Sequence, residues 1–191
     1  MRADGAGAKT VIYSITVSLD GYVADPDGDI SWGAPTPDLF AFHLEQVSEL
    51  SAYLLGRRLY ETMLVWEHDP SLRASADGAA FAEVWSALPK VVFSTTLERV
   101  EGNGRLARGS IADELERAPD GIVSVGGAAL AAACVEQDLV DEYRMFVVPE
   151  LLGGGTPYFP ARAGRLELEL LETRTFPRAV FLRHGRARAA D

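Results

Sequence analysis

Three dipeptides that carry anion-binding groups each follow a short apolar stretch of the chain: Gly56-Arg57, Ser94-Thr95 and Gly126-Gly127. Short apolar stretches bounded by such turn residues predict strands. If these strands lie parallel in one sheet, their carboxyl ends line a single crevice. An arginine can bind a phosphate through two hydrogen bonds, hydroxyls can donate to it, and a glycine turn leaves backbone N–H groups accessible. The three turns therefore predict one binding site for a phosphorylated ligand.

The Gly-Gly pair lies inside the most regular part of the chain, residues 121–149. Residues 122–125 form a β-branched run that predicts a strand, the alanine-rich residues 128–135 predict a helix, and residues 143–148 predict a second strand. Such a unit places the N-terminus of its helix above the end of the first strand, where phosphates bind. The Gly-x-Gly-x-x-Gly fingerprint is absent. Close packing of helix against sheet would also explain the two glycines.

The rest of the chain continues the alternation of strands and helices. Residues 11–19 alternate with the period of a strand, and a long loop, residues 24–37, follows. The chain closes on two strands, residues 166–175 and 179–186, joined by a short turn. This order predicts an α/β fold with a mixed, mostly parallel sheet, helices on both faces and antiparallel C-terminal strands. We expect residues 1–9 to be disordered and residues 10–187 to form one domain.

Composition excludes several classes of protein. The chain has 191 residues, a mass of 20.6 kDa and a formal net charge of −10, which argues against a nucleic-acid-binding surface. Its single cysteine, Cys134, excludes an intramolecular disulfide, and a small core residue is its expected role. No apolar stretch reaches eighteen residues and no signal peptide is recognisable, so we expect a cytoplasmic protein without a membrane partner. The three histidines are too far apart in sequence to suggest a metal site.

The order and spacing of five motifs resemble the dihydrofolate reductase-like superfamily. Within it, the chain is most similar to the reductase domain of the bifunctional riboflavin-biosynthesis deaminase-reductase, over nearly its whole length. The resemblance implies a three-layer α/β fold, NADPH as hydride donor, and a small heterocyclic substrate of the pterin or ribosylaminopyrimidine type. It implies neither metal nor flavin. The motifs are residues 18–24 (SLDGYVA), 56–57 (GR), 93–96 (FSTT), 125–128 (VGGA), and 141–142 (DE) followed by 149–159 (PELLGGGTPYF).

The resemblance also implies roles for individual residues. Arg57, after Gly56, matches the arginine that selects the 2′-phosphate of NADPH, and Ser94 and Thr95 match the hydroxyls beside it. The pyrophosphate turn corresponds to Gly126, Gly127 and Ala128. The first strand and the loop after it border the nicotinamide, and the matching residues are Thr16, Asp20, Val23 and Ala24.

Two aspartates are candidates for the proton donor, and the sequence leaves the choice open. A dihydrofolate reductase-like alignment through Trp32 places Asp38 near the substrate, whereas a riboflavin-reductase-like alignment favours Asp20. Each has a structural explanation as well. An acid in the first turn of a helix, such as Asp38, stabilises the helix dipole, and Asp20-Gly21 is an ordinary turn dipeptide.

One departure from the riboflavin reductases concerns the substrate, because those enzymes tend to carry an acid where this chain has Val125. We expect no fused deaminase, since a single cysteine cannot supply its zinc site. We expect a stand-alone NADPH-dependent reductase, and the alternative is a nucleotide-binding module of the same fold without turnover. The two closing strands would leave an apolar sheet edge exposed, which predicts a homodimer.

Overall fold

The computed structural model describes residues 9–161 and 164–187. Within them the strands are β1 (Lys9–Ser18), β2 (Tyr22–Ala24), β3 (Leu50–Gly56), β4 (Lys90–Phe93), β5 (Gly104–Leu106), β6 (Gly121–Gly126), β7 (Glu142–Val148), β8 (Thr156–Pro157), β9 (Leu168–Phe176) and β10 (Ala179–Arg186). The helices are η1 (Ser31–Gly33), α1 (Pro37–Ser48), α2 (Arg57–Met63), α3 (Val65–His68), η2 (Pro70–Arg73), α4 (Ala76–Ala87), α5 (Ile111–Arg117) and α6 (Ala128–Glu136).

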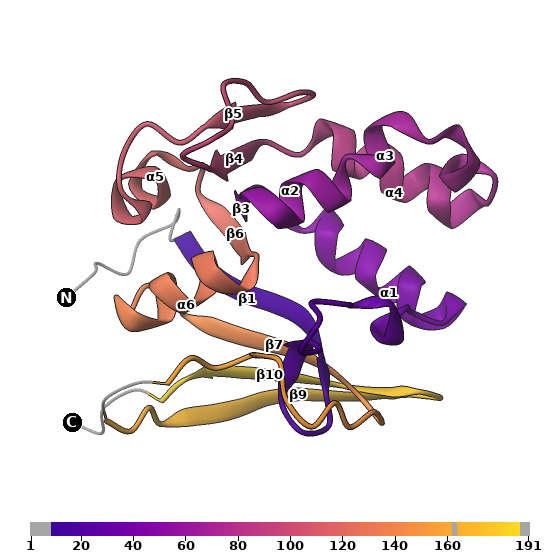
Figure 1. The fold of residues 1–191 in the computed structure, drawn as a ribbon, viewed down its shortest axis with the longest axis vertical. Coiled ribbons are helices and arrows are strands. Elements are labelled where there is room, and N and C mark those ends of the chain that lie inside the picture. The colour runs from indigo at the N-terminus through magenta and orange to yellow at the C-terminus, as the bar shows by residue number, and fades with distance from the viewer. Residues whose placement is uncertain (1–8, 162–163, 188–191) are drawn as a thin grey trace.

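One eight-stranded sheet crosses the molecule in the order β5-β4-β3-β6-β1-β7-β10-β9 (Figure 1). The strands from β5 to β7 pair in parallel with their neighbours. The last two strands reverse direction, because β10 is antiparallel to β7 and β9 is antiparallel to β10. The predicted sheet is therefore confirmed, with its mostly parallel core and antiparallel C-terminal strands.

Consecutive residues of the central strands point to opposite faces of the sheet, and each face carries helices. In β3, Leu54 packs in a cluster that contains Leu115 of α5 and Cys134 of α6, while Leu55 packs against Trp85 of α4. In β7 the same division separates Tyr143 from Phe146, which lies against α1. Helices α5 and α6 thus cover one face and α1 and α4 the other, which confirms the predicted three layers.

The strand-helix-strand unit at residues 121–149 is present as β6, α6 and β7. Its two strands are not neighbours, however, because β1 lies between them and pairs with both. The N-terminal strand is therefore the centre of the sheet. Val11, Tyr13 and Val17 on one side of β1 are at most 2% exposed. Tyr13 pairs with Val125 near the end of β6, and β1 continues to Ser18, so the turn after β1 lies beyond the end of β6 on the same edge of the sheet.

The first strand begins at Lys9, two residues before the expected start at residue 11. Lys9 belongs to β1, so the predicted disordered segment is wrong at this residue, and residues 1–8 of that prediction lie outside the described residues. The Lys9 ammonium donates to the carbonyl oxygens of Leu115 (2.5 Å) and Glu116 (3.1 Å) at the end of α5, where a cation favours the helix dipole. Across residues 9–161 and 164–187, no helix combines the length and apolarity needed to cross a membrane.

A second, two-stranded sheet joins the loop after β1 to the loop after β7. Here β2 pairs antiparallel with β8, and the N–H of Tyr158 donates to the carbonyl oxygen of Gly21 at 2.9 Å. The approach is close, since a Cβ atom on Gly155 would overlap the carbonyl oxygen of Ala24. Segments about 130 residues apart in sequence therefore form one structure at the carboxyl edge of the sheet.

Candidate functional site

The three turns that the sequence singled out lie at one edge of the sheet. Strands β4, β3 and β6 are adjacent and parallel, and their ends are level: Gly56 pairs with Phe93, and Leu55 pairs with Gly126. The structure thus brings Gly56-Arg57, Ser94-Thr95 and Gly126-Gly127 together, as the open-sheet rule predicts.

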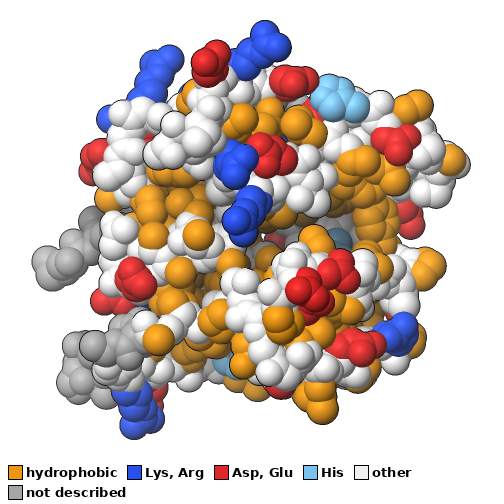
Figure 2. All heavy atoms as spheres, in the orientation of Figure 1, with side chains coloured by type: hydrophobic (Ala, Val, Ile, Leu, Met, Phe, Trp, Pro, Cys, Tyr) orange, Lys and Arg blue, Asp and Glu red, His pale blue; other side chains and the backbone are white. Residues whose placement is uncertain are grey.

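A cavity of about 780 Å³ lies over the end of β3, between the start of α2, the face of α6 and the β8 segment. Apolar side chains line much of it, and Figure 2 shows blue cationic side chains near the middle of the view, where α2 begins, beside apolar surface. Its walls are Gly56, Arg57, Arg58, Leu59, Phe93, Gly127, Ala128, Ala129, Leu130, Ala132, Ala133, Thr156, Pro157 and Pro160. We call this space the inner cavity.

A second cavity of about 520 Å³ adjoins the inner cavity and shares Arg57 and Phe93 with it. We call it the outer cavity. Its other walls are the turn after β4 and the segment after β5: Ser94, Thr95, Thr96, Ala107 and Gly109. The Ser94 hydroxyl accepts hydrogen bonds from the N–H groups of Thr96 (3.1 Å) and Leu97 (3.0 Å). Ser94 therefore shapes its own turn, while the exposed Thr95 lies at the cavity wall.

Arg57 stands at the junction of the two cavities, in the first turn of α2. Its Nη1 atom lies 3.2 Å from Glu61 Oε1, and both side chains are partly exposed, so this i,i+4 pair is weak and easily exchanged for a ligand. Arg58 lines the inner cavity as well, and the sequence analysis missed it. The signal was present in the adjacent arginine, but nothing in the sequence showed that a seven-residue helix would present both side chains to one cavity.

The two glycines at the end of β6, Gly126 and Gly127, are needed for different structural reasons. A Cβ atom on Gly126 would lie 2.6 Å from Leu59 Cδ2 and 2.8 Å from the Tyr53 ring, so packing requires this glycine. Gly127 has φ of +91° as the N-cap of α6, a conformation that other residues adopt only with strain. Gly127 and Ala128 line the inner cavity, whereas the buried Gly126 does not. The first glycine of the pair is therefore required by packing, and the second forms part of the cavity wall.

The residues expected beside the nicotinamide lie outside the walls of these two cavities. Thr16 is in β1, in register with Phe146, and a Cβ atom on Gly33 of η1 would be 3.0 Å from its methyl group. Val23 is 5% exposed in the main core, and Ala24 ends β2. These residues support the carboxyl edge of the sheet from β1 and β2, and their contact with a nicotinamide stays a prediction.

Asp20 has a clear set of partners. Its carboxylate accepts hydrogen bonds from the Ser18 hydroxyl (2.7 Å), the N–H of Leu152 (3.1 Å) and the N–H of Gly153 (2.8 Å). The hydrogen bond from Ser18, together with those from the two amides, lowers the pKa of Asp20 below its ordinary value. An ionised carboxylate that holds a loop is poorly suited to donate a proton.

Asp38 and Trp32 make local contacts. The Thr36 hydroxyl donates to Asp38 Oδ1 at 2.5 Å at the exposed start of α1. The Trp32 indole N–H donates to the carbonyl oxygen of Asp29 at 3.0 Å, and its ring packs at the edge of the cluster that includes Phe42. Neither residue lines the inner or the outer cavity, so their proposed roles toward a substrate stay predictions.

A small enclosed cavity of about 80 Å³ lies between α1 and the sheet. His43 lines it, its ring 4.0 Å from that of Phe146 between centroids, and burial lowers the pKa of His43 from 6.5 to about 4. The space suits ordered water rather than an organic ligand. Its polar lining side chains are Ser14, His43, Gln46, Tyr53 and Ser124.

The residues that the structure describes contain no group of three or more His, Cys, Asp and Glu side chains able to hold a metal ion. Cys134 is fully buried, as expected of a core residue, and burial raises the pKa of its thiol to about 12. A thiolate nucleophile is therefore not available from this side chain at neutral pH.

Comparison with known proteins agrees with this architecture. A model of the RibD C-terminal domain matches residues 9–182. The uncharacterized protein YwjB of Bacillus subtilis (strain 168) is 31% identical over 186 residues, which cover 94% of this chain and 98% of YwjB.

Two solved structures share the fold. A putative riboflavin biosynthesis protein from Shewanella sp. PV-4 superposes with a TM-score of 0.74 and 23% identity, covering 94% of this chain and 99% of that one. A dihydrofolate reductase from Enterococcus faecalis, solved with NADP(H), gives a TM-score of 0.63 and 16% identity, covering 94% and 97%.

The order of strands and the helices on both faces show a fold of the dihydrofolate reductase-like class. More narrowly, the chain belongs to the RibD C-terminal domain family, whose model spans all but the ends of the sequence. Membership of this family supports a reductase-like role for the protein.

Proposed function

We propose that this protein is an NADPH-dependent reductase that transfers a hydride to a small heterocyclic substrate of the pterin or ribosylaminopyrimidine type. The observation that carries the proposal is the pair of adjoining cavities over the ends of β3, β4 and β6, with Arg57 at their junction. Such a crevice at the carboxyl ends of parallel strands is where dinucleotides bind in open α/β sheets.

The residues of the cleft fit a phosphorylated dinucleotide. Arg57 and Arg58 supply two cations in a chain whose net charge is −10. The nine-residue helix α6 begins at Ala128 without a side-chain cap, and the first residues after Gly127 are alanines, so its free N–H groups are accessible to an anion. The two adjoining cavities would each take one half of the dinucleotide, with the adenosine end in the outer cavity.

Bound NADPH would supply the hydride from its nicotinamide ring, and the chain would supply binding and orientation. Arg57 would hold the 2′-phosphate and the start of α6 the pyrophosphate. The small sheet of β2 and β8 would close the inner cavity on the side opposite α6, since Thr156 and Pro157 line that wall. The proton would come from Asp38, Asp20 or water, and the contacts of Asp20 favour the other two sources.

The second candidate function is a nucleotide-binding module without turnover. One observation favours it: the Asp20 carboxylate already accepts hydrogen bonds from three donors. The proton donor that the riboflavin-reductase-like alignment favours is therefore engaged within the fold. On this alternative the cavities bind NADPH, but no heterocycle is reduced.

A titration followed by a substrate screen tests the proposal. We expect NADPH to bind more tightly than NADH, and pterins or pyrimidines to cause loss of the reduced nicotinamide absorbance. Binding of NADPH without loss of absorbance for any substrate of either type would favour the binding module. Absence of NADPH binding would overturn both functions.

A further inference from the structure

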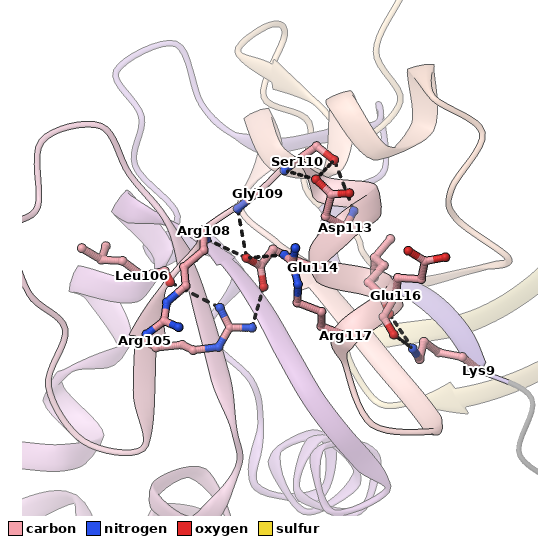
Figure 3. A network of polar contacts seen from close by, with 11 residues as sticks. Lys9, Arg105, Leu106, Arg108, Gly109, Ser110, Asp113, Glu114, Glu116 and Arg117 are labelled. Carbon is pink, nitrogen blue, oxygen red and sulfur yellow. Dashed lines mark hydrogen bonds and ion pairs between the residues drawn. The ribbon is translucent and has the colours of Figure 1, made fainter.

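Glu114 is a fully buried carboxylate near the edge of the molecule, and no step of the proposed function uses it. It lies in α5 and is 0% exposed. Oε1 accepts hydrogen bonds from the N–H groups of Arg108 (2.6 Å) and Gly109 (3.2 Å), and it also lies 3.4 Å from Arg117 Nη1 (Figure 3). Oε2 accepts from Arg105 Nη2 at 2.5 Å. We call this set of contacts the Glu114 clamp.

The clamp is not needed to begin the helix. The first turn of α5 already has a capping box, in which the Ser110 hydroxyl accepts from the N–H of Asp113 (3.2 Å) and Asp113 Oδ2 accepts from the N–H of Ser110 (2.9 Å). Desolvating a carboxylate is costly, and an apolar side chain of similar size would serve the core at least as well. The carboxylate therefore serves the segment before the helix, whose two N–H groups it binds.

That segment is a wall of the outer cavity. Ala107 and Gly109 line the cavity together with Ser94 and Thr95. The backbone at Gly109 lies tight against α5, since a Cβ atom there would be 2.8 Å from Asp113 Oδ2 and 2.9 Å from Arg117 Nη1. The Glu114 clamp thus fixes the backbone of residues 107–109 through two amides. It thereby sets the position of the cavity wall that this segment forms.

The charges around the clamp suit an anion. In the network of Figure 3 the four cations Lys9, Arg105, Arg108 and Arg117 outnumber the three acids Asp113, Glu114 and Glu116, although the whole chain has a net charge of −10. Arg57 supplies the cation among the residues that line the outer cavity. A local excess of positive charge attracts phosphates even to an acidic protein.

We propose that Glu114 is a positioning residue for the phosphate-bearing adenosine end of the dinucleotide. It acts through the backbone of residues 107–109 and has no contact with the ligand. This inference rests on the proposed function, because it assigns the outer cavity to that end of NADPH. A rigid wall lowers the ordering cost of binding, so loss of the clamp weakens affinity for this half of the ligand alone.

The test compares Glu114→Gln with Glu116→Gln, a change of an exposed carboxylate on the same helix. Calorimetry gives dissociation constants for NADPH, for 2′,5′-ADP as the adenosine half and for nicotinamide mononucleotide as the other half. For Glu114→Gln we expect both NADPH and 2′,5′-ADP to bind about tenfold more weakly, since charged hydrogen bonds of this kind are lost. Affinity for nicotinamide mononucleotide stays unchanged, and Glu116→Gln behaves as wild type.

A lowered thermal midpoint with unchanged affinity for 2′,5′-ADP would mean that Glu114 only stabilises the fold, and would overturn the inference while the proposed function stands. Failure of the wild-type protein to bind NADPH and 2′,5′-ADP would overturn both. If Glu114→Gln does not fold, Glu114→Asp replaces it. This variant keeps the charge but is one methylene too short to reach both the arginine and the two amides, so the same selective loss is expected.

Discussion

The carboxylate of Asp20 accepts a hydrogen bond from the backbone N–H of Gly153 at 2.8 Å, although the two residues are 133 positions apart. The bond ties the turn after β1 to the glycine-rich loop that leads into β8. Since Ser18 and Leu152 donate to the same carboxylate, Asp20 stays ionised at neutral pH. We therefore expect it to hold this loop rather than to act as the acid.

The first prediction concerns this loop. Asp20→Asn removes the negative charge and one of the two acceptor oxygens, so the hydrogen bonds from the two amides weaken, and hydrogen exchange at Leu152 and Gly153 should become faster by at least about tenfold. Asp27→Asn, a nearby exposed aspartate, is the control and should leave this exchange unchanged. Unchanged exchange in Asp20→Asn, with loss of the acidic limb of the pH–rate profile, would restore the general-acid role.

Arg57 should determine the choice between cofactors. A charged hydrogen bond to a phosphate contributes roughly 1.5–3 kcal/mol. Arg57→Ala should therefore weaken the binding of NADPH about ten- to a hundredfold and barely affect the binding of NADH. Glu61 Oε1 lies 3.2 Å from Arg57 Nη1 and competes with a phosphate for the same guanidinium, so Glu61→Gln should modestly increase the affinity for NADPH. Fluorescence titration of both cofactors measures this, and equal losses for NADPH and NADH would reject the 2′-phosphate contact.

The start of α6 offers a test that separates binding from folding. Ala129→Glu places a negative charge at the first turn of α6, where it stabilises the helix dipole by roughly 0.3–1 kcal/mol but repels a phosphate in the inner cavity. We expect an unchanged or higher melting temperature together with at least about tenfold weaker NADPH binding. Ala129→Gln has similar bulk without charge and should lose much less affinity. Equal losses in the two variants would point to steric blocking instead.

His43 should make the fold sensitive to mild acid. Burial lowers its pKa from 6.5 to about 4, so the unfolded chain binds a proton more readily than the folded one. The stability contributed by neutral His43 is complete above pH 6.5 and is lost as the pH falls toward 4. One proton corresponds to about 1.4 kcal/mol per pH unit, or roughly 2–3 kcal/mol over this window.

Urea unfolding of wild type and His43→Gln at several pH values measures this contribution. The difference between their free energies of unfolding should shrink as the pH falls through this window, since glutamine does not titrate. His68→Gln, at a more exposed histidine beside Glu101, is the matched control. A pH-independent difference for His43→Gln would show that His43 is protonated without cost in the fold.

The edge strand β9 should mediate dimerisation. Leu170 and Leu171 on this strand are 56% and 43% exposed. A monomer would leave this apolar surface in contact with water at an open sheet edge. Light scattering at micromolar concentration should give about twice the 20.6 kDa of one chain. Leu170→Glu should shift the mass to that of a monomer, whereas Leu151→Glu, at another exposed leucine, should not. A monomeric wild type would end the proposal.

Much of this fold follows from local sequence, whereas the site depends on distant contacts. The strand ends at Gly56, Phe93 and Gly126 are visible in the sequence because apolar runs stop there. That they lie side by side follows from the parallel sheet. The position of β1 between β6 and β7 is not encoded by any one stretch, since strand order depends on which faces pack together.

Polar residues were the harder part of the prediction. Asp20 in a turn dipeptide and Glu114 in a helix of charged residues look like ordinary surface acids. Their partners, Gly153 and the amides of residues 108–109, belong to backbone whose position is set by the tertiary fold. Arg58 was missed for the same reason, because sequence does not show which side of a short helix faces a cavity.

The buried thiol of Cys134 makes the protein convenient for labelling. With its pKa raised to about 12 and its side chain 0% exposed, the native chain should not react with maleimides under folding conditions. A cysteine introduced at an exposed position, such as Leu151 in the loop held by Asp20, would then be the sole reactive site. A fluorophore or spin label there would report any movement of this loop on ligand binding, without removal of a native residue from the core.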